Sequence, residues 1–119
     1  MTESDRSCVI SLAEAQKRIP GPPNAHFVTV IQRGTVRALL SLPVSPNRQT
    51  PHAQDEVYVI VRGRGVLFHE GRREQFAAGD FIFIAAGVEH WFEDFSDDLA
   101  VWVVFYGPTG GEVPEHEPV

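Results

Sequence analysis

The sequence contains little cysteine, few basic residues and no long apolar run. Cys8 is the only cysteine among 119 residues, so an intramolecular disulfide is excluded and nothing indicates an oxidising compartment. Ten basic residues against 16 acidic ones leave a net charge of −6, which argues against a nucleic-acid partner because such proteins concentrate Lys and Arg. No apolar stretch approaches the roughly 20 residues that a membrane-spanning helix needs.

The N-terminus is polar and lacks the basic, then apolar, layout of a signal peptide. Apolar residues make up 43% of the chain and charged residues 22%, which is typical of a globular domain. The length suits one domain with one core. We therefore expect a soluble, cytoplasmic protein that has neither a nucleic acid nor a membrane as its partner.

The chain divides into an arm, a β-rich domain and a tail. Residues 1–24 form the arm, with a short helix from Leu12 to Ile19, because Ser11 and Glu14 match a capping box and Pro20 stops the helix. Residues 25–106 contain eight or nine short β-branched and aromatic segments separated by turn signals, which predicts an all-β sandwich or small barrel. Residues 107–119 are expected to be a mobile or loosely docked acidic tail, rich in Pro and Gly.

Two of the expected strands, 81–84 and 101–105, are apolar on both faces. A barrel strand reads this way when one side faces the interior and the other faces a second layer or a partner subunit. Together with the N-terminal segment, this pattern predicts a homodimer that covers the outer face and the strand edges.

A histidine and a carboxylate lie four residues apart just before one expected strand. His52 and Glu56 precede the run 57–61, which is closed by Gly63 and Gly65. Loop-borne ligands at the start of a stiff strand make a plausible metal or catalytic site. Such a spacing also arises by chance, as a surface histidine beside an acidic turn, so the site needs a third ligand from elsewhere.

Two segments in register resemble the two motifs of the cupin superfamily, over about residues 26–106. The segments are His52-x3-Glu56-x6-Gly63 and Gly79-x5-Ala85-x-Gly87-x2-His90-x3-Asp94. The chain is similar to small single-domain microbial cupins of the cupin 2 type, which implies an all-β jelly-roll barrel with a short N-terminal helix. The resemblance also implies a metal site inside the barrel made of His52, Glu56 and His90.

The departures from the family pattern concern the ligands and the turns. Thr50 stands where the first motif has its first histidine, which removes one of the four usual ligands. Val44, Ala85 and Asp94 replace the leading glycine, the proline and the asparagine of the motifs. The side-chain oxygens near His52 that can serve as a weak fourth ligand belong to Gln49, Thr50 and Gln54.

Two histidines and one carboxylate suit Fe, Mn, Ni or Zn as the divalent ion, and the identity of the metal stays open. Tyr58 shares the parity of Glu56 along its strand, so both side chains face the same interior. Core packing with its hydroxyl at a polar rim is the simpler interpretation of Tyr58, and a catalytic role is the alternative. Tyr58 and Phe83 are the candidates for contacts with a substrate.

Two kinds of function remain open. The first is an enzyme that acts on a small organic substrate through the metal, in a dioxygenase-like or isomerase-like reaction, as the resemblance implies. The second is a non-catalytic small-molecule-binding or sensor cupin with a degenerate metal site, which Thr50 favours. A purely structural metal site is disfavoured, because no fourth strong ligand is evident.

Overall fold

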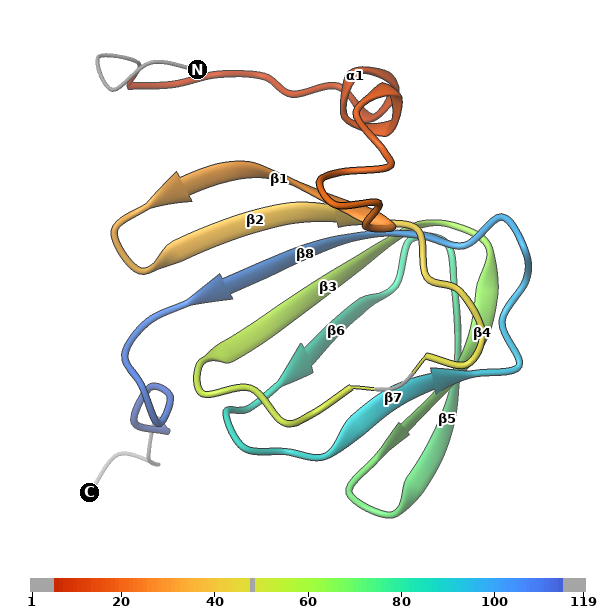
Figure 1. The fold of residues 1–119 in the computed structure, drawn as a ribbon. Helices are drawn as coiled ribbons and strands as arrows, with labels where there is room; N and C mark the ends of the chain where they lie inside the picture. The colour runs from red at the N-terminus through yellow and green to blue at the C-terminus, as the bar shows by residue number, and fades with distance from the viewer. Residues whose placement is uncertain (1–5, 48, 115–119) are drawn as a thin grey trace.

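The computed structural model describes residues 6–47 and 49–114, and it consists mainly of two antiparallel sheets that enclose a common interior (Figure 1). A five-stranded sheet has the order β1-β2-β8-β3-β6, and a three-stranded sheet has the order β5-β4-β7. The strands are β1 (Phe27–Arg33), β2 (Val36–Ser41), β3 (Asp55–Arg62), β4 (Arg64–His69), β5 (Arg72–Ala77), β6 (Phe81–Ile84), β7 (His90–Glu93) and β8 (Ala100–Tyr106). The predicted all-β class with one short helix is confirmed for the described residues.

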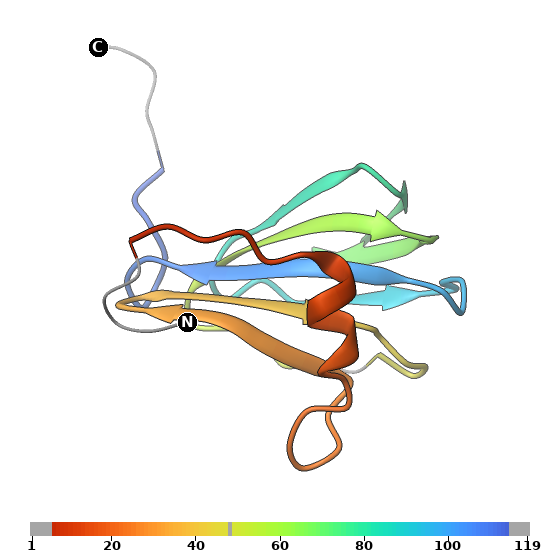
Figure 2. The ribbon, with the colours of Figure 1, turned by 90° about the horizontal axis from the view of Figure 1, so that it is seen from above.

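The helix α1 (Leu12–Lys17) begins as its capping signal predicts. The hydroxyl of Ser11 accepts a hydrogen bond from the backbone N–H of Glu14 at 3.1 Å. The helix ends at Lys17, two residues before the expected end. It packs against β1 and β2, and Figure 2 shows it beside the C-terminal end of β2. No helix in the described ranges is long and apolar enough to cross a bilayer.

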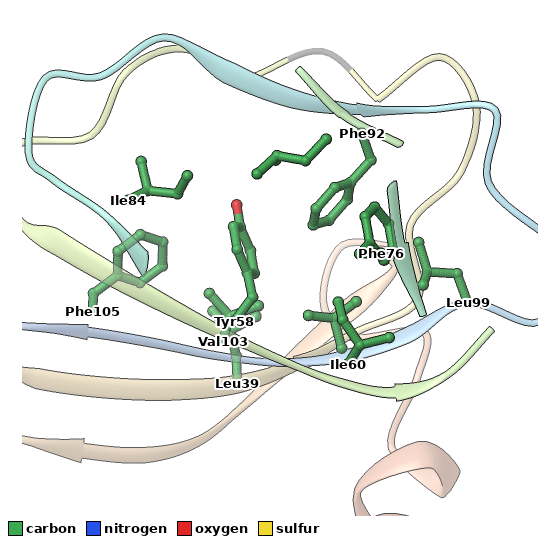
Figure 3. Packing of buried hydrophobic residues seen from close by; sticks show 11 residues of the cluster. Leu39, Tyr58, Ile60, Phe76, Ile84, Phe92, Leu99, Val103 and Phe105 are labelled. Carbon is green, nitrogen blue, oxygen red and sulfur yellow. The ribbon is translucent and has the colours of Figure 1, made fainter. Parts of the chain in front are cut away.

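The core lies between the two sheets, and alternation along β3 selects the side chains that enter it. Glu56, Tyr58 and Ile60 are buried, while Val59 at the opposite parity is exposed. Figure 3 shows the hydroxyl of Tyr58 directed into the interior, between Phe105 and Phe92. The buried cluster comprises Leu39, Tyr58, Ile60, Leu67, Phe76, Ile84, Phe92, Leu99, Val101, Val103 and Phe105.

The register of β6 against β3 decides which of its side chains face the interior. Ile84 pairs with Glu56 and is buried, so it faces inward. Phe83 pairs with Val57 and is 52% exposed, and Phe81 is 68% exposed. The two phenylalanines therefore lie on the outer face of the five-stranded sheet.

Part of the expected tail is hydrogen-bonded to the loop before β3 and to the start of β3. The backbone N–H of Gly110 donates to the carbonyl of Ala53 at 2.7 Å, and that of Glu112 donates to Oδ2 of Asp55 at 2.8 Å. A Cβ at Gly111 would lie 2.6 Å from Oδ1 of Asp55, so only glycine allows this approach. Residues 115–119 of the expected tail lie outside the described residues.

We expect Asp55→Ala to lower the free energy of unfolding by about 1–3 kcal/mol, because it leaves two partly buried backbone hydrogen bonds without their charged acceptor. The side chain of Asp55 accepts from Ala86 N–H at 2.9 Å as well as from Glu112 N–H. Urea unfolding measures the change. The matched control is Asp97→Ala on the exposed acidic loop, which should change stability by no more than about 0.5 kcal/mol. Equal effects of the two substitutions would show that the hydrogen bonds of Asp55 to Ala86 and Glu112 do not stabilise the fold.

Candidate metal centre

Three side chains from separate parts of the chain meet inside the barrel. His52, Glu56 and His90 each offer one ligand atom, and these atoms lie within 4.8 Å of one another. His52 comes from the loop before β3, Glu56 from the start of β3 and His90 from the start of β7. Glu56 and His90 are 2% and 1% exposed, whereas the side chain of His52 is 32% exposed. The cluster is therefore buried on two sides and open on the side of His52.

A backbone hydrogen bond joins the two loops that carry the histidines. The N–H of Gly87 donates to the carbonyl of His52 at 2.8 Å. Gly87 has a φ of +82°, a conformation that residues with a side chain rarely adopt. This glycine lets the second loop turn back toward His52 while His90 enters β7 three residues later.

Glu56 and His90 form the most buried contact of the cluster. Nδ1 of His90 donates to the carbonyl of Val88 at 2.8 Å, so in the neutral ring Nε2 is left as an acceptor. That Nε2 lies 3.0 Å from Oε1 of Glu56. Oε1 is buried and has no hydrogen-bond partner among the described residues. Two buried acceptors that face each other are stable only with a cation or a proton between them.

The residues present fit a divalent metal ion. Neutral imidazole and carboxylate are the ligands that Fe, Mn, Ni and Zn accept. Nε2 of His52 lies 3.8 Å from the same Oε1 of Glu56, so both imidazoles flank one carboxylate oxygen. The hydrogen bond from His90 to Val88 orients its ring as metal-bound histidines usually are oriented.

The two histidines experience different electrostatic environments. Burial lowers the pKa of His90, but the adjacent Glu56 carboxylate and the Val88 carbonyl raise it by more, so the net pKa is raised. Burial is also the largest effect on His52 and lowers its pKa; Glu56 opposes this, while His90 and Arg37 add to it. In the metal-free protein the proton therefore resides on His90 in preference to His52.

Tyr58 and Gln49 complete the polar lining beside the histidines. The hydroxyl of Tyr58 lies 3.1 Å from Nε2 of His90 and donates to Oε1 of Gln49 at 3.3 Å. Burial and the neighbouring Glu56 carboxylate raise the pKa of Tyr58 well above its ordinary value. Oε1 of Gln49 also lies 3.4 Å from Nε2 of His52, and its amide donates to Asn47 Oδ1 at 2.8 Å.

A cavity of about 310 Å³ opens beside the cluster. His52, Glu56, Tyr58 and Gln49 lie along it, and so does one cationic side chain, Arg37. The rest of the wall is mainly apolar and is made by Phe27, Leu39, Pro43, Phe92, Val103 and Phe105. A small apolar pocket with a few convergent polar groups is the usual form of a small-molecule site.

Three residues named from the sequence lie elsewhere. Phe83 faces outward and does not line the cavity, which corrects the expectation that it contacts a substrate there. Thr50 is exposed and is not part of the cavity wall. The amide of Gln54 donates to the carbonyls of Thr35 and Gly107, both at 2.9 Å, so it ties two loops together.

Sequence reasoning missed most of the cavity wall, including two polar residues that shape it, Arg37 and Asn47. Arg37 lies two residues before Leu39 in β2, so both side chains point to the same face of the sheet. Assigning Leu39 to the core from the sequence would have placed Arg37 on the inner face as well. Oδ1 of Asn47 accepts the backbone N–H of Phe92 at 3.0 Å, which joins the loop before His52 to β7. No pattern around Asn47 indicates this bond.

Comparison with known proteins identifies the family. The sequence profile of the family described as Cupin domain (Cupin_2) matches residues 41–106, more than half of the chain. The chain is a cupin. The matched part contains all three residues of the cluster and every strand from β3 to β8.

Two curated relatives of this cupin share part of their sequence with it. An uncharacterised protein of Streptomyces coelicolor is 47% identical over 60 residues, which are 50% of this chain and 57% of that protein. An uncharacterised protein of Aquifex aeolicus is 30% identical over 59 residues, which are 49% of this chain and 48% of that protein. The chain therefore spans about half the length of the curated relatives it matches.

Solved structures similar to this cupin share its fold at low sequence identity. A cupin 2 conserved barrel domain protein from Salinispora arenicola CNS-205 matches with a TM-score of 0.60 and 18% identity, over 71% of this chain and 76% of the other. The DMSP lyase DddQ from Ruegeria pomeroyi DSS-3 matches with a TM-score of 0.59 and 20% identity, over 68% and 46%. KdgF from Halomonas sp. matches with a TM-score of 0.60 and 17% identity, over 67% and 76%.

In the metal-free protein, we expect the ring of His90 to titrate at a higher pH than the ring of His52. Folding raises the pKa of His90, so its contribution to stability is present below the unfolded pKa and is lost as the pH rises through the folded one. The chemical shifts of the ring protons, followed by NMR, measure both pKa values. His52→Gln and His90→Gln each remove one signal and assign the rest. The reverse order of titration would be inconsistent with the Glu56–His90 contact.

Proposed function

We propose that this cupin holds a divalent metal ion through His52, Glu56 and His90 and acts on a small organic molecule in the adjacent cavity. The observation that carries the proposal is the buried Oε1 of Glu56, which lacks a hydrogen-bond partner and faces Nε2 of His90. Glu56 and His90 would hold a metal ion here, which would supply the positive charge that the two facing acceptors lack. Three protein ligands also leave coordination positions open for a substrate.

Gln49 is our candidate for a weak fourth ligand, in the role that Thr50 leaves unfilled. Its amide oxygen faces His52 and Tyr58, and its amide nitrogen is held by Asn47. Thr50 and Gln54 do not line the cavity. Carbonyl oxygens bind divalent metals less strongly than imidazole or carboxylate, so Gln49 adjusts the affinity without determining it.

Once bound, the metal would polarise a substrate oxygen as a Lewis acid or support oxygen activation. The hydroxyl of Tyr58 favours the Lewis-acid role. The phenol keeps its proton at neutral pH, and its raised pKa suits it to donate a hydrogen bond to a substrate oxygen and not to give up the proton. The hydroxyl lies 3.1 Å from His90, beside the centre. We therefore favour an isomerase-like reaction, in which this hydrogen bond would stabilise negative charge on the substrate oxygen, over a dioxygenase-like one.

The second candidate is a non-catalytic sensor that binds a small molecule. The exposed position of Thr50 favours it, because only three strong ligands remain. Turnover separates the two candidates: metal-loaded protein is mixed with an excess of small hydroxy- and oxo-compounds in deuterated water and followed by NMR. Exchange of substrate protons for deuterium in more than one equivalent of substrate per protein supports the enzyme. If Tyr58→Phe no longer catalyses this exchange, the role of Tyr58 is supported. Binding without conversion supports the sensor, and oxygen consumption supports the dioxygenase-like reaction.

We expect His52→Ala, Glu56→Gln and His90→Ala each to abolish metal binding, because each removes one of only three strong ligands. Gln49→Ala should weaken binding by less, and Gln54→Ala should leave it unchanged. Elemental analysis and titration calorimetry with Mn(II) and Zn(II) measure stoichiometry and affinity. His26→Ala is the matched histidine control outside the cluster. Full metal content in both histidine variants of the cluster would show that the ligands are wrongly assigned.

We also propose a homodimer formed through the outer face of the five-stranded sheet. Phe81, Phe83 and Val59 are 68%, 52% and 36% exposed, and Val59 lies directly opposite Phe81 in the β3–β6 pair. β6 is an edge strand of its sheet. A contiguous exposed apolar surface at an open strand edge is typical of a protein–protein interface.

Sedimentation velocity at micromolar concentration tests the dimer. We expect a dimer for the unmodified chain and a monomer for the double variant Phe81→Ser, Phe83→Ser, because that variant removes the largest apolar surface of the proposed interface. Val36→Ser, at an exposed valine of the β1–β2 hairpin on the opposite edge of the sheet, is the control and should leave the dimer intact. A monomeric unmodified chain would rule out the proposal.

A further inference from the structure

The cavity beside the metal ligands contains a cation without a charged partner. Arg37 lies on β2 at the inward parity of Leu39 and lines the cavity with it. Its guanidinium carbon lies 4.9 Å from the centroid of the Phe105 ring. Within residues 6–47 and 49–114, no carboxylate forms an ion pair with Arg37.

Arg37 lines the cavity together with His52 and Glu56, two of the three proposed metal ligands. The ring of His52 lies 4.9 Å from the same Phe105 ring, so His52 and Arg37 cannot be farther apart than the sum of these two distances. Phe105 is also the residue directly opposite Arg37 in the β2–β8 pair. The guanidinium is therefore held over a rigid aromatic surface, within reach of a molecule that also contacts the cluster.

The guanidinium is suited to bind an anion at this place. Its planar fork of N–H donors matches the two oxygens of a carboxylate, and stacking on an aromatic ring leaves the edge of the fork available. The remaining wall is mainly apolar, and the volume of about 310 Å³ is at the low end for ligand pockets. The pocket therefore suits a small molecule with an apolar body and a single charged group.

We propose that the substrate or ligand of this cavity is a small, largely apolar carboxylate whose anionic group pairs with Arg37. This inference rests on the proposed function for the location of the binding site, but it adds the chemical class of the molecule that binds there. A metal ion at the cluster would add further positive charge and strengthen the preference for an anion. The chain as a whole carries a net charge of −6, so the attraction has to come from a local cation such as Arg37.

Stacking on Phe105 alone is the competing role for Arg37. A cation–π contact at a partly exposed site contributes about 0.5–1 kcal/mol to stability and needs no ligand. That role predicts a change in unfolding when Arg37 is replaced, but no selectivity between charged and neutral ligands. Ligand selectivity is therefore the measurement that separates the two roles.

The test compares carboxylates with their neutral amides as ligands of the full chain. Isovalerate, 2-oxoisovalerate and benzoate are titrated beside isovaleramide and benzamide, and dissociation constants are measured by ligand-observed NMR. Both the metal-free and the Zn(II)-loaded protein are used. We expect at least one acid to bind about tenfold more tightly than its amide, which corresponds to about 1.4 kcal/mol. Arg37→Gln should remove this preference in the metal-free protein, and Arg37→Lys should retain part of it.

Arg72→Gln on the exposed strand β5 is the matched control and should keep the full preference. Circular dichroism confirms that each variant is folded, and Arg37→Lys keeps the charge if Arg37→Gln does not fold. Equal binding of acids and amides, no binding of any acid, or a preference that survives in Arg37→Gln would overturn the inference. Metal content is measured on the same samples. Acid selectivity without metal binding would refute only the proposed metal function, and metal binding without acid selectivity would refute only the role of Arg37.

Discussion

The contact between Glu56 and His90 is the constraint on which the rest of the interior depends. The two residues belong to different sheets, Glu56 to the five-stranded one and His90 to the three-stranded one, and both are buried. Burying a carboxylate without a counter-charge costs several kcal/mol, so the sheets can close over this pair only if a proton or a metal ion joins it. Against the effect of burial, the Glu56 carboxylate and the Val88 carbonyl raise the pKa of His90, which favours a proton on its ring in the absence of a metal.

The surrounding structure holds the polar centre in place inside an apolar barrel. Val88 orients the ring of His90 from behind, and Tyr58 closes the inner side. The loop that carries His52 is tied to Gly87 on one side, and its next residue, Ala53, is tied to the C-terminal segment on the other. Ligands fixed in this way lose little conformational entropy on binding a metal, which is why backbone contacts far from the ligand atoms affect the site.

Thr50 in place of a usual cupin ligand would change which donor atoms surround a bound metal. Thr50 is exposed, and the neighbouring loop places Gln49 beside His52 and Tyr58 instead. An amide oxygen is a weaker donor to a divalent metal than an imidazole, so a bound metal would keep more of its positive charge for an anionic ligand. Arg37, on the same cavity wall, is consistent with this shift toward anions.

The sequence by itself determined the all-β class, the helix start at Ser11 and the inward side of β3, because capping and two-residue alternation are local properties. The resemblance to the two cupin motifs associated His90 with His52 and Glu56, and the structure brings the three together. Only the tertiary structure shows which side of β6 faces inward, because the sequence of a strand that is apolar on both faces does not distinguish its two sides. The tertiary structure was also needed to place Gln49 beside His52, to show the hydrogen bonds of the C-terminal segment and to show that Arg37 lines the cavity. Each depends on loop conformation or on pairing between distant segments, and no local period in the sequence encodes these.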